Sequence, residues 1–329
     1  MANRLFILGN GVDWCEKSLQ GIKEHENIYL LNKKIPVEGN IKNKLAKIYF
    51  SYKINSKIQL PFKSFWYKDI KKYIKKNIND GDELCVLIYD HNTFGGEVSF
   101  SKYLRKEFKN IKLVYIFTNI VNYTAAMEKK YLDKLNDWYD VVYAFDLEDS
   151  KKYNFKYFPL IYSYNHIDVK EKNQVFYVGK AKDRYNMLMN CYDKLEELGI
   201  NRKFYIVDVP EENQKHKDEI QYNKFLTYNE CLKNIQESSC LIDIIQGEST
   251  GFTIKTCEAV YYDKLLITTN QNVKNAPFYD ERYILVINSA EDITKEFFEK
   301  AGQVKYSDEG KAYFSVDTFL NKLYKDLSI

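Results

Sequence analysis

The chain alternates short apolar segments with amphipathic segments along nearly its whole length, and this alternation constrains the fold more than any other feature. The apolar segments have the near-continuous hydrophobic character of strands that are buried on both faces of a sheet. Segments with helical spacing of apolar residues separate them, a pattern typical of α/β proteins with parallel sheets. The predicted strands are 4–8, 28–31, 83–89, 111–117, 140–145, 174–179, 203–208, 239–245, 264–269 and 283–287.

The series of strands and helices nearly restarts at Gln174, after a polar and charged stretch that follows Pro159. A chain of 329 residues is long enough for two domains of about 150 residues each. We therefore predict two Rossmann-like domains, 1–165 and 166–329, that face a central cleft. The apolar residues of 315–327 have helical spacing, and this last helix is expected to pack back on the first domain. The predicted helices are 12–24, 66–78, 98–109, 124–137, 183–198, 228–237, 252–262 and 290–300.

Composition narrows the class of protein. The sequence has neither an apolar run of about 18 residues nor a leader-like start, so we expect a cytoplasmic protein. Its six cysteines are scattered without a CxxC pair, which favours buried, reduced thiols. With only four histidines a histidine-based metal site is not expected.

Charge is distributed unevenly between the two halves. Residues 1–165 hold 27 Lys and Arg against 19 Asp and Glu, a net charge of +8. The other 164 residues hold 22 against 27, a net charge of −5. Most of the excess lies in residues 41–76, which contain 11 Lys and one acid, Asp69. The first half therefore attracts anionic surfaces or substrates.

The segment 238–270 is the most informative one, because it reads as strand, loop, helix and strand. Its loop, Gln246–Gly251, contains two glycines and small polar residues, and it leads into the N-terminus of a helix. Such a place suits a phosphate, because backbone N–H groups and the helix dipole both favour an anion. Lys255 is placed to neutralise a diphosphate. Glu258 lies about 10 Å along the helix from its start, where a carboxylate can accept hydrogen bonds from ribose hydroxyls; the alternative is a surface glutamate on an exposed helix face.

The run QGESTGFTIKTCEAVYYDKLLITTN, residues 246–270, resembles the donor-nucleotide motif of GT-B glycosyltransferases. More narrowly, it resembles bacterial enzymes that assemble capsule, lipopolysaccharide and other cell-surface polysaccharides. The resemblance covers the second domain well and the first only loosely. It implies ribose binding by Glu258 and contact between the diphosphate and the backbone of Thr250, Gly251, Phe252 and Thr253. GT-B enzymes stabilise the leaving diphosphate without a bound metal, and the sequence has no convincing DxD motif, so we expect neither a metal nor another cofactor.

Two further segments of the second domain fit the same resemblance. Gly179, Lys180 and Arg184 follow its first strand, where GT-B enzymes place a basic residue on the donor diphosphate; the alternative is solvated charge on an ordinary turn. Arginine suits phosphate because its planar fork donates two parallel hydrogen bonds. Tyr228 lies where these enzymes hold the nucleotide base by stacking, and Asn229 is a candidate cap for the helix that follows.

The first domain is expected to bind the acceptor. Polar residues at the carboxyl end of strand 83–89 face the ligand side of a parallel sheet. An inverting transferase needs a base for the acceptor hydroxyl, and Asp90, His91 and Glu97 are the candidates. A retaining enzyme of this fold would need none. The sequence ILGNG (7–11) has no third glycine of the dinucleotide fingerprint, so it reads as a tight turn.

The segment 64–78 places Trp66, Ile70 and Ile74 on one face of a helix and five lysines on the rest. A basic amphipathic helix of this kind can lie on an anionic bilayer; the alternative is a core-facing helix with a solvated lysine face. We expect an anionic membrane surface as a partner of 41–76, at the inner face of the membrane. Nucleic acid is not expected, because no nucleic-acid-binding module accompanies the lysines.

Together these features predict transfer of a sugar from a nucleotide diphosphate sugar to a growing, lipid-linked surface glycan. Two alternatives stay open. One is a non-catalytic subunit that binds a nucleotide sugar within a transferase complex, and the other is a sugar-nucleotide epimerase of the same fold.

Overall fold

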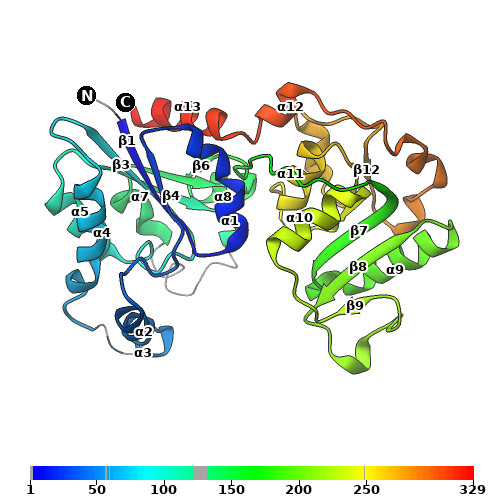
Figure 1. Cartoon of the computed structure of the whole chain (residues 1–329), viewed down its shortest axis with the longest axis horizontal. Coiled ribbons are helices and arrows are strands. Elements are labelled where there is room, and N and C mark those ends of the chain that lie inside the picture. The colour runs from blue at the N-terminus through cyan, green and yellow to red at the C-terminus, as the bar shows by residue number, and fades with distance from the viewer. Residues whose placement is uncertain (1–2, 56–57, 59, 122–131, 248) are drawn as a thin grey trace. The chain divides into compact units, whose positions relative to one another are not determined.

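A computed structural model describes the chain except for residues 1–2, 56–57, 59, 122–131 and 248. The chain is divided into two compact units (Figure 1). The first comprises Met1–Pro159 and Phe319–Ile329, and the second comprises Leu160–Thr318. Each predicted strand is present within a few residues of its predicted bounds, and each unit contains a six-stranded sheet.

The sheet of the first unit is parallel throughout, with the strand order β2-β1-β3-β4-β5-β6. Its direction of growth reverses between β1 and β3, where Leu5 pairs with Ile28 of β2 on one side and with Cys85 of β3 on the other. The strands are β1 (Asn3–Leu8), β2 (Ile28–Leu31), β3 (Glu83–Tyr89), β4 (Lys112–Phe117), β5 (Val141–Ala144) and β6 (Lys156–Tyr157). Loops at the carboxyl ends of β1 and β3 therefore meet at a topological switch point, the usual ligand site of such sheets.

Helices cover this sheet, and α4 and α5 lie side by side against it (Figure 1). The core between them is aromatic: Tyr67 packs its ring 4.9 Å from Phe94 and 4.9 Å from Phe100. Much of the predicted helix 124–137 lies outside the described residues. The helices and 3-10 turns are α1 (Asp13–Ser18), η1 (Gln20–Glu24), α2 (Asn40–Tyr49), α3 (Tyr52–Asn55), α4 (Ser64–Lys76), α5 (Val98–Glu107), η3 (Leu132–Lys134), α7 (Leu135–Trp138) and α8 (Leu147–Lys152).

The last helix, α13 (Val316–Leu327), contributes its residues from Phe319 onward to the first unit. Phe319 packs 5.0 Å from Phe158, and the hydroxyl of Tyr143 donates a 2.7 Å hydrogen bond to Asp326. These contacts attach the end of the chain to the sheet of the first unit.

The sheet of the second unit is also parallel, with the strand order β12-β11-β10-β7-β8-β9. Its direction reverses between β7 and β10, so this unit has a switch point as well. Its strands are β7 (Lys172–Lys180), β8 (Arg202–Val207), β9 (Gln221–Tyr222), β10 (Ser238–Asp243), β11 (Leu265–Thr268) and β12 (Ile284–Val286). Its helices and 3-10 turns are η4 (Lys182–Arg184), α9 (Tyr185–Glu197), η5 (Glu211–Asn213), α10 (Tyr228–Glu237), α11 (Ile254–Tyr261), η6 (Gln271–Asn275), η7 (Ala290–Asp292), η8 (Lys295–Lys300) and α12 (Asp308–Ala312).

Two local predictions are wrong. The single helix expected over 290–300 is a pair of 3-10 turns, η7 and η8. Asn229 does not cap α10; Thr227 does, because its hydroxyl accepts from the N–H of Glu230 while the Glu230 carboxylate accepts from the N–H of Thr227.

The basic amphipathic helix α4, for which a bilayer surface and the core were both open, packs its apolar face in the core, where Trp66, Ile70 and Ile74 are buried. The core-facing alternative therefore holds for the apolar face of this helix, while the contact of its lysine face with an anionic membrane stays a prediction. Within the described part of the chain, no helix combines the length and the apolar character needed to cross a bilayer. All six cysteines are free, and five are buried.

Candidate functional site

The switch point of the second unit gathers most of the residues singled out in that half. Gly179 lies at the end of β7 and Asp243 at the end of β10, and the helices α9 and α11 begin just beyond these two strands. The two strands are neighbours in the sheet. Side chains from both loops therefore converge although they are far apart in sequence.

The N-terminus of α11 is fixed to the end of β10 by Thr253 and Asp243. Thr253 is the N-cap, and its hydroxyl oxygen accepts from the N–H groups of Lys255 and Thr256 at 3.1 and 3.4 Å. The same hydroxyl donates to the buried carboxylate of Asp243 at 2.7 Å, and the hydroxyl of Thr256 donates to it at 3.0 Å. The strand thus sets the direction of the helix axis.

The loop before α11 is held from its other side by β11 and the turn that follows. Asn270, which is fully buried, donates to the carbonyl of Gly251 at 3.0 Å, and Asn272 donates to that of Thr250 at 3.4 Å. The ring of Phe252 packs edge-on 5.1 Å from Phe278 in the core, so only the backbone of Phe252 is available to a ligand. These side chains fix the position of the loop, and a loop that binds a ligand through its backbone N–H groups has to be held in this way.

Lys255 is half-buried at this end of the helix, and its ammonium lies 5.3 Å from the centre of the Tyr177 ring. Gly179 makes the space: a Cβ added there would lie 2.9 Å from the Tyr177 hydroxyl and 3.6 Å from the Lys255 nitrogen. Burial lowers the pKa of Lys255, Asp243 opposes the shift and Arg184 adds to it. No carboxylate of the described residues pairs with this ammonium within 4.0 Å. A half-buried ammonium whose neighbouring carboxylates, those of Asp243 and Glu258, lie beyond ion-pair distance favours binding of an anion.

Glu258 lies one helical turn further along α11 and is only 2% exposed. Its Oε1 accepts a 2.8 Å hydrogen bond from the hydroxyl of Tyr228, which lies 3.1 Å from the hydroxyl of Tyr162. Burial raises the pKa of Glu258 to about 7, although Tyr228 and Lys255 both act to lower it. The alternative of a solvated surface glutamate is wrong. A buried carboxyl with a pKa near neutrality, in a cluster of polar groups, is typical of a functional site.

Arg184 and Lys180 have partners already. The Arg184 guanidinium donates to the carbonyls of Ile244 and Lys180 at 2.8 and 2.6 Å, and so joins the ends of β10 and β7. Lys180 is half-exposed in an ion pair with Asp208 at 2.9 Å. Their predicted contacts with a diphosphate stay predictions, and Lys255 is the better-placed cation.

Sequence reasoning placed Tyr228 near the nucleotide base but missed its contact with Glu258, and it missed Tyr162 altogether. Tyr162 precedes β7 and Tyr228 begins α10, so nothing in their spacing relates them to α11. The predicted stacking of a base on Tyr228 stays a prediction, but its hydroxyl has an evident second role in orienting the carboxyl of Glu258.

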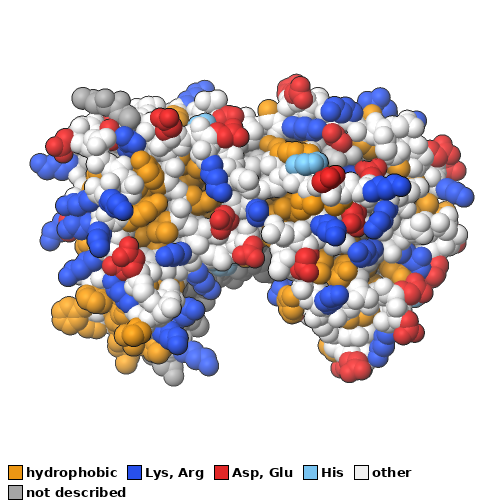
Figure 2. All heavy atoms as spheres, in the orientation of Figure 1, with side chains coloured by type: hydrophobic (Ala, Val, Ile, Leu, Met, Phe, Trp, Pro, Cys, Tyr) orange, Lys and Arg blue, Asp and Glu red, His pale blue; other side chains and the backbone are white. Residues whose placement is uncertain are grey.

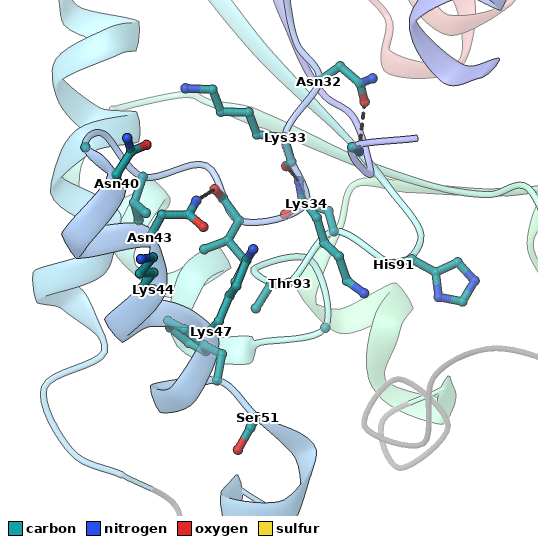
Figure 3. A pocket seen from close by; sticks show the side chains of 17 residues that line it. Asn32, Lys33, Lys34, Asn40, Asn43, Lys44, Lys47, Ser51, His91 and Thr93 are labelled. Atoms are coloured by element: carbon teal, nitrogen blue, oxygen red, sulfur yellow. Dashed lines mark hydrogen bonds between the residues drawn. The ribbon is translucent and has the colours of Figure 1, made fainter. Parts of the chain in front are cut away.

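The switch point of the first unit contains a cavity of about 1200 Å³. Loops after β1, β2 and β3 line it together with α2, and Figure 3 shows lysines from two of these elements around the hollow with His91 at its edge. Asn92 holds the loops together, because its buried amide donates to the carbonyls of Gly9 and Lys33 at 2.7 and 3.1 Å. The lysines that line the cavity are Lys33, Lys34, Lys44 and Lys47.

Only one of the three candidate bases, His91, has a solvent-exposed side chain. Asp90 is fully buried and accepts from the N–H and hydroxyl of Thr118 at 3.0 and 2.6 Å, so it organises the turn after β3. Glu97 is buried in an ion pair with Lys63 at 2.5 Å. His91 adopts a left-handed conformation, φ 62°, which turns its ring outward between two buried neighbours and leaves the side chain 33% exposed.

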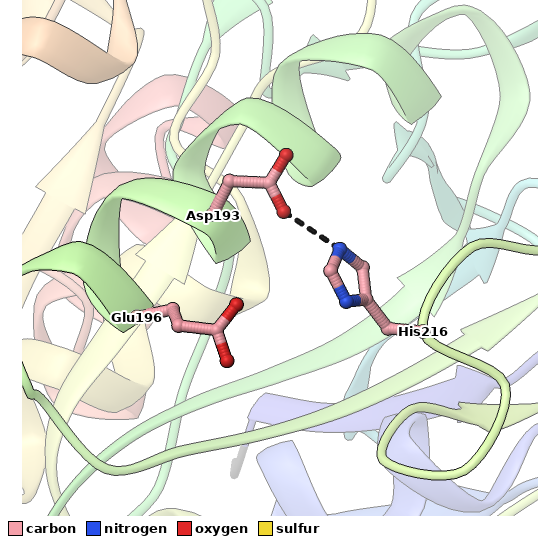
Figure 4. A group of neighbouring side chains, drawn as sticks. All are labelled: Asp193, Glu196 and His216. Carbon is pink, nitrogen blue, oxygen red and sulfur yellow. Dashed lines mark hydrogen bonds and ion pairs between the residues drawn. The ribbon is translucent and has the colours of Figure 1, made fainter.

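Asp193, Glu196 and His216 form a separate cluster near the end of α9, with ligand atoms within 4.8 Å of one another (Figure 4). His216 lies 2.7 Å from the Asp193 carboxylate, and Arg202 pairs with Glu196 at 2.5 Å. Because a guanidinium already balances the acid, these residues are explained as a surface ion-pair network.

No protein-family model matches the chain, and no curated protein sequence is significantly similar to it. Solved structures do match. AviGT4, a glycosyltransferase involved in avilamycin A biosynthesis, aligns with a TM-score of 0.58 over 99% of this chain and 97% of its own, at 7% identity. An α-glucosyltransferase in complex with UDP-glucose and DNA containing an abasic site aligns with a TM-score of 0.54 over 99% of both chains, at 11% identity.

TarM aligns with a TM-score of 0.51 over 79% of this chain, at 10% identity; the match spans only 57% of TarM. At such low identity these likenesses establish the fold and nothing finer. With its two parallel six-stranded sheets, the chain has the GT-B fold predicted from sequence.

Proposed function

We propose that the chain is a glycosyltransferase that takes its sugar from a nucleotide diphosphate sugar bound at the switch point of the second unit. The observation that carries the proposal is the geometry of α11. The half-buried ammonium of Lys255 lies at the N-terminus of this helix, and no carboxylate of the described residues is paired with it. The buried carboxyl of Glu258 lies one turn further along. That order of charges matches a diphosphate followed by a ribose.

In this proposal the diphosphate lies against the backbone of Thr250–Thr253 and the ammonium of Lys255. The two ribose hydroxyls donate to Glu258, whose carboxylate is kept in place by the hydroxyl of Tyr228. During transfer, negative charge builds up on the leaving diphosphate. The helix dipole and Lys255 stabilise that charge, as fixed electrostatic groups do in many active sites. This chemistry requires no bound metal.

The acceptor, in the same proposal, is a growing lipid-linked surface glycan that binds to the first unit at the inner face of the membrane. His91 is the candidate base for an inverting reaction, because it is the exposed member of the three candidates and borders the cavity. A retaining reaction would leave His91 with a binding role only.

Incubation with a panel of UDP-, GDP-, CDP- and dTDP-sugars tests the proposal, with release of the nucleoside diphosphate as the readout. We expect one class of donor to be turned over by the wild type and by Glu212→Ala, a control on the exposed turn η5, but not by Glu258→Ala. Binding without release in the presence of acceptor glycans would favour the non-catalytic subunit. Absence of binding for all four classes would contradict the proposal.

A further inference from the structure

Helix α2 has three distinct faces, and only one of them is used by the core. Ala46 is buried, and Lys42 pairs with Asp69 of α4 at 2.7 Å, which attaches the helix to the first unit. A second face, with Asn40, Asn43, Lys44 and Lys47, lines the cavity of the first unit. The third face is apolar and exposed.

The exposed apolar face of α2, called here the α2 ridge, consists of Ile41, Leu45 and Ile48. Their spacing of three and four residues aligns them along one side of the helix. They are 77%, 54% and 61% exposed. Phe62 and Phe65, just before and at the start of α4, are exposed too, and Lys42 lies 5.1 Å from the Phe65 ring. Figure 2 shows this concentration of apolar side chains beside α2, with basic side chains around it.

Scattered exposed apolar residues need no explanation, but a contiguous group on one helix marks an interaction surface. Basic groups border this one. Lys44 and Lys47 lie on the adjacent face of α2, and neither they nor the other cavity lysines, Lys33 and Lys34, have a carboxylate partner within 4.0 Å among the described residues. By contrast Lys71, on the lysine face of α4, pairs with Glu107 at 2.6 Å. Among the described residues that line the cavity, none is acidic.

We propose that this cavity binds the phosphate group of a membrane-anchored amphiphile while the α2 ridge, Phe62 and Phe65 enter the headgroup boundary of an anionic bilayer. Helix α2 carries both sets of residues: the lysines that would bind the phosphate lie on the face next to the residues that would contact lipid. A helix with an apolar face and flanking lysines lies in the plane of such an interface. The proposal rests on the proposed function, in which this amphiphile is the acceptor.

The lysines beside the α2 ridge favour a bilayer that contains anionic lipid as the partner of this surface, because their charge is complementary to it. Lysines near such a surface are attracted within a Debye length of about 10 Å, and a phosphate within the cavity can be reached by lysines from two directions, the loop after β2 and α2. A soluble anion would account for the lysines but would leave the ridge exposed to water.

Co-sedimentation with vesicles tests the proposal, using phosphatidylglycerol vesicles and neutral phosphatidylcholine vesicles as the probes. The wild type is expected to bind the anionic vesicles only. Ile41→Ser combined with Leu45→Ser and Ile48→Ser is expected to weaken this binding by about tenfold or more, because the apolar contact is lost. Lys44→Gln combined with Lys47→Gln is expected to weaken it as well.

The matched control is Lys72→Gln combined with Lys75→Gln, which removes the same charge from α4 and is expected to change binding by less than about twofold. If the control weakened binding as much as the α2 variants, attraction would be non-specific and the proposal wrong. Stabilisation by inorganic pyrophosphate that depends on Lys44 and Lys47, without vesicle binding, would assign the cavity to a soluble anion and overturn it.

Binding of a nucleotide sugar by each variant separates this proposal from the proposed function. The substituted residues are exposed on the first unit, and the donor cluster lies within the second, so donor affinity is expected to stay unchanged. Normal donor binding reports only that the second unit is folded, so an unchanged thermal unfolding transition is the check that the first unit of each variant is folded. Loss of vesicle binding by Glu258→Ala would contradict the assignment of the lipid contact to α2.

Discussion

Protonation of Glu258 is expected to make the affinity for a nucleotide sugar depend on pH. Burial raises the pKa of this carboxyl to about 7 in the free protein. A carboxylate that accepts hydrogen bonds from two ribose hydroxyls must be ionised, so the ligand binds to the deprotonated form. Affinity should therefore rise with pH up to about 7 and level off above it.

The magnitude follows from the pKa. Half of the carboxyls are ionised near pH 7 but only about one in eleven at pH 6, a loss of about fivefold in the ionised fraction, or about 1 kcal/mol. Affinity at pH 6 is thus expected to be about tenfold lower than at pH 8, and at pH 5 about 100-fold lower, if the bound form stays ionised.

The stability of the free protein should change in the opposite direction. Because the folded pKa of Glu258, about 7, lies above the ordinary value of 4.5 for a glutamate, the folded state holds this proton more tightly than the unfolded state does. The resulting stabilisation is fully present below the unfolded pKa and is lost as pH rises through about 7. Thermal unfolding without ligand measures this contribution separately from binding.

Isothermal titration with a nucleotide diphosphate sugar between pH 5 and 8 measures the effect. The two phosphates of such a ligand stay ionised in this range, so the change reports on the protein. Lys255, Asp243 and Tyr228 are the charged or titratable groups that act most on Glu258. Glu258→Gln is expected to bind weakly and without the slope, whereas the surface variant Glu212→Gln should keep it. A flat profile in the wild type, or an equal slope in Glu258→Gln, would refute the reasoning.

Three other predictions follow from the same cluster. Lys255→Ala should weaken binding of a nucleoside diphosphate by about 10- to 100-fold, as expected for a hydrogen bond to a charged group. Binding of the nucleoside should weaken much less, because Lys255 affects the ribose only through the pKa of Glu258. Calorimetry would compare both ligands with Lys217→Ala as the control, and equal losses would count against a phosphate contact. Tyr228→Phe removes a hydrogen bond that lowers the pKa of Glu258, so the midpoint of the pH profile should move upward, and an unmoved or lowered midpoint would contradict this role. Treatment with EDTA should leave transfer activity intact, whereas strict dependence on an added divalent ion would argue for a metal-assisted departure of the diphosphate.

Much of the fold could be predicted because parallel strands that are buried on both faces leave an unmistakable sequence signal. The apolar runs that became β3, β4 and β10 are bounded by polar turns and match their predicted ranges within a few residues. The two-residue strands β6 and β9 have too few residues to show periodicity, and both escaped prediction.

The candidate site was predictable only where it is local in sequence. Thr253, Lys255 and Glu258 lie within one turn or two of each other, so a helix model places them. The contact of Glu258 with Tyr228 is decided by tertiary packing, and 29 tyrosines make any one of them an arbitrary choice.

The burial of Asp90 likewise depends on the neighbouring strand β4, whose end supplies Thr118 as its hydrogen-bond donor. Sequence position identified the edge of the sheet but could not distinguish a carboxylate facing a ligand from one that organises a turn.

Hydrogen exchange in the presence of a nucleotide sugar tests the central claim most directly, since it reports where the donor binds. After titration with UDP-, GDP-, CDP- and dTDP-sugars has identified a ligand, the exchange rates of backbone amides would be compared with and without it. We predict slower exchange in the loop 249–253 and in α11, and no such protection in Glu258→Ala. Protection confined to the first unit, or binding that leaves exchange in α11 unchanged, would contradict the account.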